Sequence, residues 1–107
     1  ACRKQARDRF AERTAFFAGI LGVSYGKITI RDQKTRWGSC SRAGNLNYNF
    51  RLILAPPEVL DYVVVHELCH RKQMNHSALF WQEVEKVLPD YQERRRWLRT
   101  EGWRLME

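Results

Sequence analysis

The sequence predicts an α+β fold, in which an N-terminal helix is followed by a short antiparallel β-sheet, a central helix and C-terminal helices. Two observations predict this order. Apolar residues recur at helical spacing near the N-terminus and again after residue 55, whereas residues 27–52 alternate between apolar and polar positions, as strands do. Helices and strands therefore occupy separate stretches of the chain, which is typical of α+β proteins. Because 107 residues can bury one hydrophobic core, we expect a single domain over residues 1–107.

The first half of the chain supplies one helix and three strands. An amphipathic helix is expected from residue 1 to about residue 22, and its apolar side chains are Phe10, Phe16, Phe17, Ile20 and Leu21. Strands are expected at residues 27–31, 36–40 and 46–52. The third strand alternates apolar residues with Asn, Asn and Arg, which predicts a half-buried strand at an edge of the sheet.

The second half is helical. The Pro-Pro-Glu segment at residues 56–58 begins the central helix, which we expect to end near residue 72. Residues 62–69 are apolar almost all round, so this helix should lie at the centre of the core. Two later helices are expected at residues 78–87, with Ser77 as N-cap, and from Asp90 toward Gly102.

Composition narrows the functional classes. No apolar run approaches the roughly 20 residues of a membrane span, and three cysteines do not form a disulfide framework. We therefore expect reduced thiols, a cytoplasmic location and no membrane partner. The net charge of +7 favours nucleic acid, phosphate or an acidic partner, or alternatively a basic solvated surface. Since the chain begins with Ala1 and not Met, we expect a processed protein or a piece of a longer one.

The central helix contains the motif H-E-x-x-H as His66-Glu67-Leu68-Cys69-His70. Residues four apart lie on one helical face, so His66 and His70 can direct ring nitrogens at one ion. Neutral imidazole is a good zinc ligand, and zinc lowers the pKa of a bound water toward about 7. Glu67 is then expected to act as the general base that takes the proton from this water.

A catalytic zinc usually has three protein ligands, and His76 is the expected third. It stands six residues after His70, the spacing of H-E-x-x-H-x-x-G-x-x-H sites, but Gln73 replaces the glycine that permits a sharp turn. We therefore expect the turn at residues 74–75, where Asn tolerates the left-handed region. The alternative third ligands are Glu83 and Glu85. Cys69 is expected to pack in the core, and an approach of Cys40 to the metal is the less favoured option.

Beyond this motif, an ordered series of segments resembles the YgjP-like zinc metallopeptidase family, which is related to SprT-like and WLM-type proteases. The segments lie between Ile28 and Trp97: Thr35-Arg36-Trp37-Gly38-Ser39-Cys40-Ser41, Asn49-Phe50-Arg51-Leu52, Ala55-Pro56-Pro57-Glu58, residues 63–70, Asn75-His76-Ser77, Phe80-Trp81 and Leu88-Pro89-Asp90-Tyr91. The resemblance implies a small zincin-like domain, zinc ligands at His66, His70 and His76, and a general base at Glu67. Phe50 departs from the Trp that this family has in its N-W-R segment.

Three functions follow as hypotheses. The first is a zinc-dependent metallopeptidase, in which the strand at residues 46–51 pairs with an extended peptide. Its polar residues Asn47, Asn49 and Arg51 would either position the substrate or form a solvated face. The second is a metal-dependent nucleoside-triphosphate pyrophosphatase, an activity also attached to this family, with phosphates held by Arg36, Arg42 and Arg51. The chain has no glycine-rich phosphate loop, which weakens this second hypothesis.

The third hypothesis is a nucleic-acid-associated, protease-like binding module. Basic and aromatic residues are interleaved at Lys34-Thr35-Arg36-Trp37 and at Arg94-Arg95-Arg96-Trp97-Leu98-Arg99, as on many nucleic-acid surfaces. The favoured alternative for the second run is a solvated helix face whose Trp97 packs inward.

Overall fold

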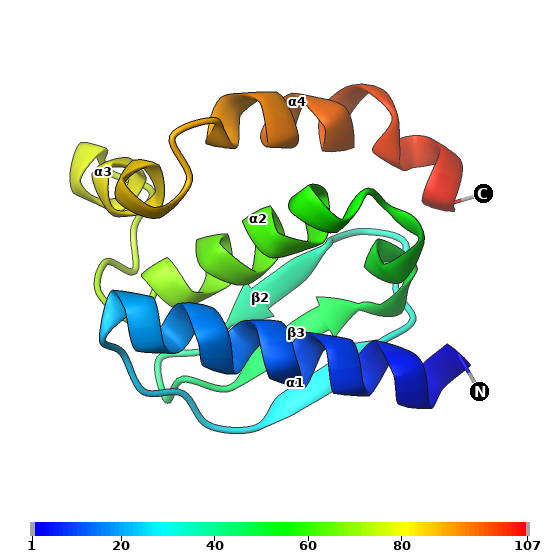
Figure 1. Cartoon of the computed structure of the whole chain (residues 1–107), viewed down its shortest axis with the longest axis horizontal. Coiled ribbons are helices and arrows are strands. Elements are labelled where there is room, and N and C mark those ends of the chain that lie inside the picture. The colour runs from blue at the N-terminus through cyan, green and yellow to red at the C-terminus, as the bar shows by residue number, and fades with distance from the viewer. Residues whose placement is uncertain (1, 107) are drawn as a thin grey trace.

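Four α-helices and one three-stranded sheet make up the part of the chain that the computed structural model describes, residues 2–106 (Figure 1). The elements in chain order are α1 (Cys2–Leu21), β1 (Ile28–Arg31), β2 (Gly38–Cys40), β3 (Leu46–Asn49), the 3₁₀ helix η1 (Phe50–Leu54), α2 (Pro57–Cys69), α3 (Ala78–Val87), α4 (Tyr91–Thr100) and the 3₁₀ helix η2 (Gly102–Met106). The α+β class predicted from the sequence is therefore confirmed. None of the helices in these residues has the length and hydropathy that a bilayer span requires.

The sheet differs from the predicted one in two respects. Its strand order is β1-β3-β2, and β3 pairs in parallel with β1 but antiparallel with β2, so the sheet is mixed and not antiparallel throughout. The strand predicted at an edge, β3, is the central one. The reason is that β2 and β3 form a hairpin, with its turn at Ser41–Asn45, and β1 occupies the remaining side of β3.

The polar residues of β3 explain why the edge prediction was wrong. Asn49 is only 1% exposed, because its amide nitrogen donates to the carbonyl oxygens of Gln33 (2.6 Å) and Arg36 (3.2 Å). The Oδ1 atom of Asn49 accepts from the backbone N–H of Arg51, and this bond caps the start of η1. The strand therefore ends three residues earlier than predicted. Alternation of polar residues here reflects internal hydrogen bonds and not exposure to water.

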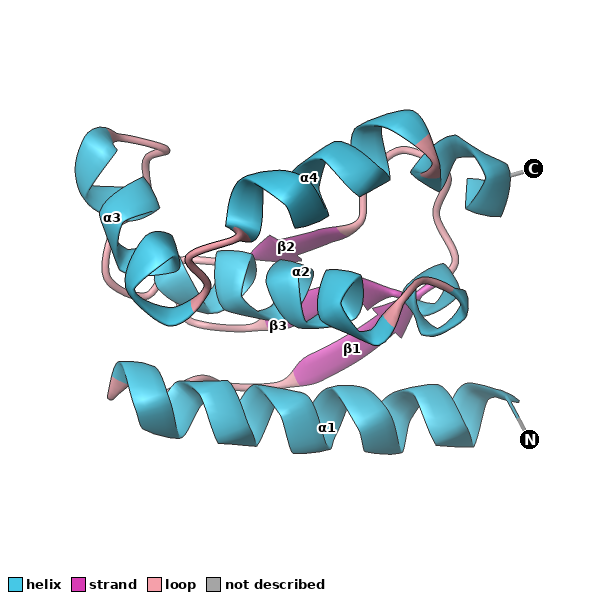
Figure 2. Cartoon of the chain, turned by 45° about the horizontal axis from the view of Figure 1, so that its top comes forward, coloured by secondary structure: helices cyan, strands magenta, loops and turns pink. Residues whose placement is uncertain are grey.

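Helix α2 lies at the centre of the core, as its apolar composition predicts. Figure 2 shows α2 and the sheet between α1 on one side and α4 on the other. The side chains of Val64, Val65 and Leu68 are fully buried. Helix α1 is joined to α2 by the paired hydrogen bonds of Arg13 to the carboxylate of Asp61, at 2.9 and 3.0 Å. This packing makes α2 a rigid base for the side chains that it directs toward β2 and α3.

A candidate metal centre

Three histidines converge where α2 ends. His66 lies on α2 and His70 is its C-cap residue, so both rings occupy the same helical face, with centroids 5.3 Å apart. His76 joins them after the chain has turned, and its Nε2 lies 3.1 Å from Nε2 of His66. One ring nitrogen from each of the three lies within 4.8 Å of the others. The cluster is therefore a set of donors that could hold a metal ion.

The turn between His70 and His76 needs no left-handed residue. Helix α2 closes with short-range bonds, in which the N–H groups of Arg71 and Lys72 donate to the carbonyls of Leu68 (2.9 Å) and Cys69 (3.0 Å). No residue other than glycine has a positive φ among residues 2–106. The expected left-handed turn at residues 74–75 was therefore wrong, because a 3₁₀-like helix end already reverses the chain.

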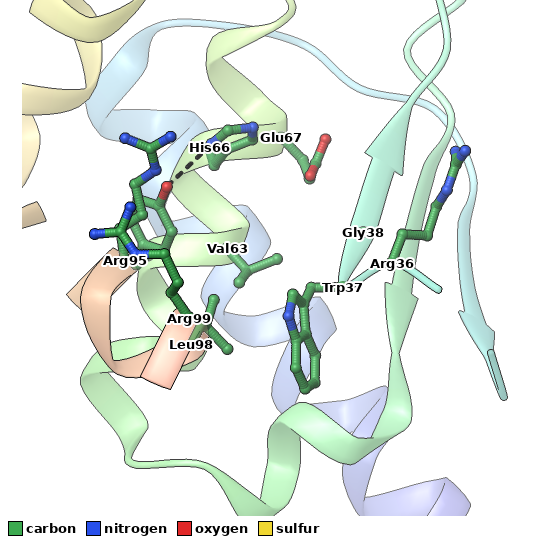
Figure 3. A pocket seen from close by; sticks show the side chains of 10 residues that line it. Arg36, Trp37, Gly38, Val63, His66, Glu67, Arg95, Leu98 and Arg99 are labelled. Carbon is green, nitrogen blue, oxygen red and sulfur yellow. Dashed lines mark hydrogen bonds between the residues drawn. The ribbon is translucent and has the colours of Figure 1, made fainter. Parts of the chain in front are cut away.

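Two polar contacts orient the imidazoles. Nδ1 of His70 lies 3.2 Å from the carbonyl oxygen of Gln73. Because a carbonyl only accepts, Nδ1 carries the proton and Nε2 keeps its lone pair for the centre of the cluster. Nδ1 of His66 lies 3.4 Å from the hydroxyl of Tyr62, one helical turn earlier (Figure 3). Gln73, which stands where related motifs have glycine, thus orients the ring of His70 through its backbone carbonyl group.

Burial favours the neutral form of His66 and His70. Burial, followed by the proximity of His70 and His76, lowers the pKa of His66 from 6.5 to about 3. The pKa of His70 is lowered mainly by burial, too. The ring of Phe80, which is fully buried, packs against all three imidazoles, with centroids 4.6–5.0 Å apart. Neutral rings are the form that binds metal ions.

Glu67 lies beside this cluster and faces β2. Its side chain is directed toward the strand in Figure 3, and the residue is 6% exposed. Burial raises the pKa of Glu67 from 4.5 to about 8, and the positive charge of Arg36 opposes part of this shift. A cavity of about 240 Å³ joins Glu67 to the histidines, and it is lined by Gly38, Ser39, Cys40, His66, Glu67, His70, Met74 and His76. One carboxyl and three imidazoles thus share one cavity with the backbone of β2.

The alternative ligands lie elsewhere. Glu83 accepts from Lys72 (3.2 Å) and Lys86 (3.3 Å), which lowers its pKa, and Glu85 is exposed on α3. Neither belongs to the histidine cluster. Cys69 is fully buried in the core, as expected, and burial raises its pKa to about 12. Cys40 lines the cavity, but its thiol donates to the carbonyl of Ser41 at 3.4 Å.

The residues expected to position a substrate support the fold instead. Asn47 accepts from Nε of Arg31 and donates to Oγ of Ser39, and Asn49 is buried. Arg51 donates to the carbonyl of Gln33 and pairs with Asp32 at 2.9 Å. Asn49 and Arg51 thus hold the segment before β2, whereas Asn47 links β1 to β2, and none of the three lines the cavities beside Glu67.

The contact of Tyr62 with His66 was not predicted from the sequence, and Arg95 and Arg99 were predicted only as members of a basic run. Tyr62 was counted among the apolar residues of α2, although its position four residues before His66 predicts a contact on one helical face. Arg95 and Arg99 are also four apart, and both line a second cavity, of about 380 Å³, next to Glu67. The arginines of the basic run therefore differ in their surroundings: Arg95 and Arg99 line the cavity, whereas Arg94 is paired with Asp90 at 2.9 Å.

The fold was compared with solved structures, and the sequence was compared with curated proteins and with models of protein families. Two solved structures share the fold. The metallopeptidase zymogen of Pyrococcus abyssi abylysin superposes with a TM-score of 0.76 and 28% identity, over 87% of this chain and 95% of its own. The metallopeptidase zymogen of Methanocaldococcus jannaschii jannalysin gives a TM-score of 0.74 and 21% identity, over 87% of this chain and 96% of its own. No curated protein matches the chain significantly.

The family model described as "YgjP-like, metallopeptidase domain" matches residues 1–101. This match covers nearly the whole chain and includes the histidine cluster, Glu67 and all three strands. It extends well beyond the region between Ile28 and Trp97 that carries the resemblance in the sequence. The chain therefore belongs to the YgjP-like metallopeptidase domain family.

Proposed function

We propose that the protein is a zinc-dependent metallopeptidase in which His66, His70 and His76 bind the zinc and Glu67 is the general base, with residues 1–107 acting as one zincin-like domain. The observation that carries this proposal is the convergence of three ring nitrogens within 4.8 Å of one another, in the cavity that Glu67 lines. The family membership supports a hydrolase that acts on peptides.

The donor set fits zinc. Two nitrogens bound to one tetrahedral zinc, each at about 2.0–2.1 Å, stand roughly 3.3 Å apart. The separation of 3.1 Å between Nε2 of His66 and Nε2 of His76 is close to this value, and the other donor nitrogens lie no more than 4.8 Å apart. Within residues 2–106, no fourth donor joins the three histidines, and three protein ligands with an open position are typical of catalytic and not structural zinc sites. When bound, zinc supplies Lewis-acid chemistry, because it lowers the pKa of a water molecule and polarises the substrate carbonyl.

Glu67 moves the proton. An Oε of Glu67 takes the proton from the attacking water, because its side chain lines the cavity that it shares with the three histidines. The same oxygen then delivers it to the leaving amine nitrogen as the peptide bond breaks. The buried position of Glu67 between α2 and β2 keeps bulk water away from this transfer.

Strand β2 is the element that we expect to align the substrate. It is an edge strand, and its three residues line the cavity that contains Glu67. The backbone groups of Trp37 and Ser41 point to β3, as the bonds from Asn49 N–H (2.9 Å) and to Asn45 O (3.0 Å) indicate. Since bonding alternates along an antiparallel strand, Gly38 and Cys40 present their N–H and C=O groups on the open side. An extended peptide would pair with these two residues.

The test compares the zinc-loaded protein with its Glu67→Gln variant on a peptide library and, separately, on nucleoside triphosphates. We expect cleavage of peptides by the wild-type protein, its loss in the variant and unchanged zinc content in both. Turnover of nucleoside triphosphates alone, lost in Glu67→Gln, would replace peptidase activity with pyrophosphatase activity. If neither substrate class shows turnover that depends on Glu67, the proposal is wrong.

A further inference from the structure

A second cavity, of about 380 Å³, adjoins the histidine cluster. It shares Gly38, His66 and Glu67 with the smaller cavity and is enclosed by β2, α2 and α4. Figure 3 shows Trp37 on one side and Arg95 and Arg99 of α4 on the other. Because the two cavities meet at Glu67, a substrate whose reacting bond lies beside Glu67 would place a neighbouring group here.

The charge of this cavity is strongly positive. Arg95 and Arg99 lie one turn apart on α4, and Arg36 also contributes to the lining, whereas Glu67 is the one carboxyl group among the described residues that line it. Within residues 2–106, no carboxylate lies within 4.0 Å of the guanidinium nitrogens of Arg95 or Arg99. Two like charges at i and i+4 destabilise a helix, so this face of α4 is suited to an anion that is not part of the described chain.

The side chains around these arginines favour an anion on an apolar stem. The guanidinium carbon of Arg95 lies 4.9 Å above the ring of Trp81, which in turn stacks on Tyr91 at 5.3 Å. This stacking orients Arg95 before a ligand arrives. Trp37, Val63 and Leu98 supply apolar surface to the same cavity. A carboxylate at the end of a short carbon chain satisfies both parts of the cavity.

We propose that the cavity lined by Arg95 and Arg99 binds a carboxylate of the peptide substrate, from an Asp or Glu side chain near the scissile bond or from the peptide's C-terminus. This inference rests on the proposed function. Arginine binds carboxylates through two parallel N–H···O bonds, so two arginines on one helical face supply enough donors for one such group. The carboxylate would lie next to the site of cleavage, since His66 and Glu67 line the same cavity.

The first experiment identifies cleavage sites in a peptide library by mass spectrometry and repeats the measurement with free-acid and amidated C-termini. Enrichment of Asp and Glu near the cleaved bond would identify the side chain, and preference for the free acid would identify the terminus. In either case Arg95→Gln/Arg99→Gln should lower kcat/KM for the preferred peptides about tenfold or more, since bonds to charged groups are strong. The same loss is not expected for their neutral counterparts.

Two further variants control for charge and folding. Arg96→Gln removes an exposed charge from the same helix outside the cavity and should leave the preference unchanged. Arg99→Gln alone should reduce the preference and leave the fold intact, because the side chain of Arg99 is exposed and, unlike Arg95, makes no stacking contact with Trp81. The ratio of kcat/KM for the preferred peptides to kcat/KM for their neutral counterparts measures the preference. If this ratio is the same in the double variant and the wild-type protein, the inference is overturned.

A second experiment does not depend on catalysis. The metal-free protein is titrated with N-acetylglutamate amide, N-acetylglutamine amide, N-acetylleucine and N-acetylleucine amide, and the indole N–H of Trp37 is followed by NMR. We expect shifts with at least one carboxylate, none with the neutral compounds, and loss of the shifts in Arg99→Gln but not in Arg96→Gln. If no peptide is cleaved, the proposed function fails while this titration still decides the inference. Shifts with inorganic phosphate but with neither carboxylate would contradict it.

Discussion

Gly38 of β2 lies directly against Glu67 of α2: a Cβ at residue 38 would stand 3.2 Å from the carboxylate oxygen Oε2 of Glu67 and 3.0 Å from the backbone carbonyl of Asn47. The carbonyl is held in the neighbouring strand, so an added methyl group would push the carboxyl group of Glu67 by a few tenths of an ångström. The absence of a side chain at residue 38 thus keeps the proposed general base beside the histidine cluster.

Gly38→Ala should therefore impair hydrolysis while the fold persists. Since a misplacement of about 1 Å costs roughly a hundredfold in rate, a shift of a few tenths of an ångström should lower kcat/KM for a cleaved peptide about three- to tenfold. Gly19→Ala on α1 is the matched control, because a Cβ there meets nothing within 4 Å and alanine favours helices. Unchanged kcat/KM in Gly38→Ala would show that Glu67 tolerates the methyl group or does not act in the reaction.

His76→Ala should abolish stoichiometric zinc binding. With His76 removed, only His66 and His70 remain in the cluster, and two imidazoles hold zinc weakly compared with three. Zinc content after dialysis, measured by mass spectrometry of the metal, is the readout. Glu83→Gln and Glu85→Gln serve as controls and should retain one zinc per chain. Full occupancy in His76→Ala would place the third ligand elsewhere.

A double-mutant cycle should reveal a buried hydrogen bond between α1 and β3. Thr14 and Tyr48 are fully buried, and their hydroxyl groups lie 3.0 Å apart. Thr14→Val leaves the Tyr48 hydroxyl without its partner and should lower the free energy of unfolding by about 1–3 kcal/mol. Adding Tyr48→Phe removes the unsatisfied group, so the double variant should lose less than the sum of the single changes. Urea unfolding provides the measurement, and additive losses would show that the bond contributes nothing.

The metal-free protein should become less stable as pH rises from 4.5 to 8 on account of Glu67. Its pKa is raised from 4.5 in the unfolded chain to about 8, so in this range the native state binds one proton more. The free energy of unfolding then falls by up to about 1.4 kcal/mol per pH unit. The Glu67→Gln variant lacks this pH-dependent loss of stability. It should therefore be more stable than the wild-type protein at pH 8 but not at pH 4.5.

The contribution of His66 to the stability of the metal-free protein has the opposite dependence on pH. The pKa of His66 is lowered from 6.5 to about 3, so the unfolded chain binds more protons between these values and stability is lost as pH falls through them. The difference in melting temperature between Glu67→Gln and wild type, measured with a chelator present, isolates the Glu67 contribution because both proteins retain His66. A difference that does not grow with pH would contradict the raised pKa of Glu67.

Local patterns in the sequence were sufficient to predict the helices and the candidate ligands. The apolar composition of residues 62–69 identified α2 as the central helix, and Ser77 and Asp90 mark the starts of α3 and α4. The spacing of His66 and His70 depends on helical geometry, His76 follows after a short turn, and the structure brings the three rings together. Such features depend on interactions between residues that are close in the chain, so they can be predicted from the sequence alone.

The position of β3 and the surroundings of Glu67 were decided by contacts between distant segments. The parallel partner of β3 is β1, and Asn49 is buried through bonds to a loop 13 to 16 residues away, so its polarity misled the edge prediction. Likewise, only the packing of α4 beside α2 brings Arg95 and Arg99 to the cavity next to Glu67. A side chain's type is visible in the sequence, but its neighbour across the core is settled by the packing of the whole chain.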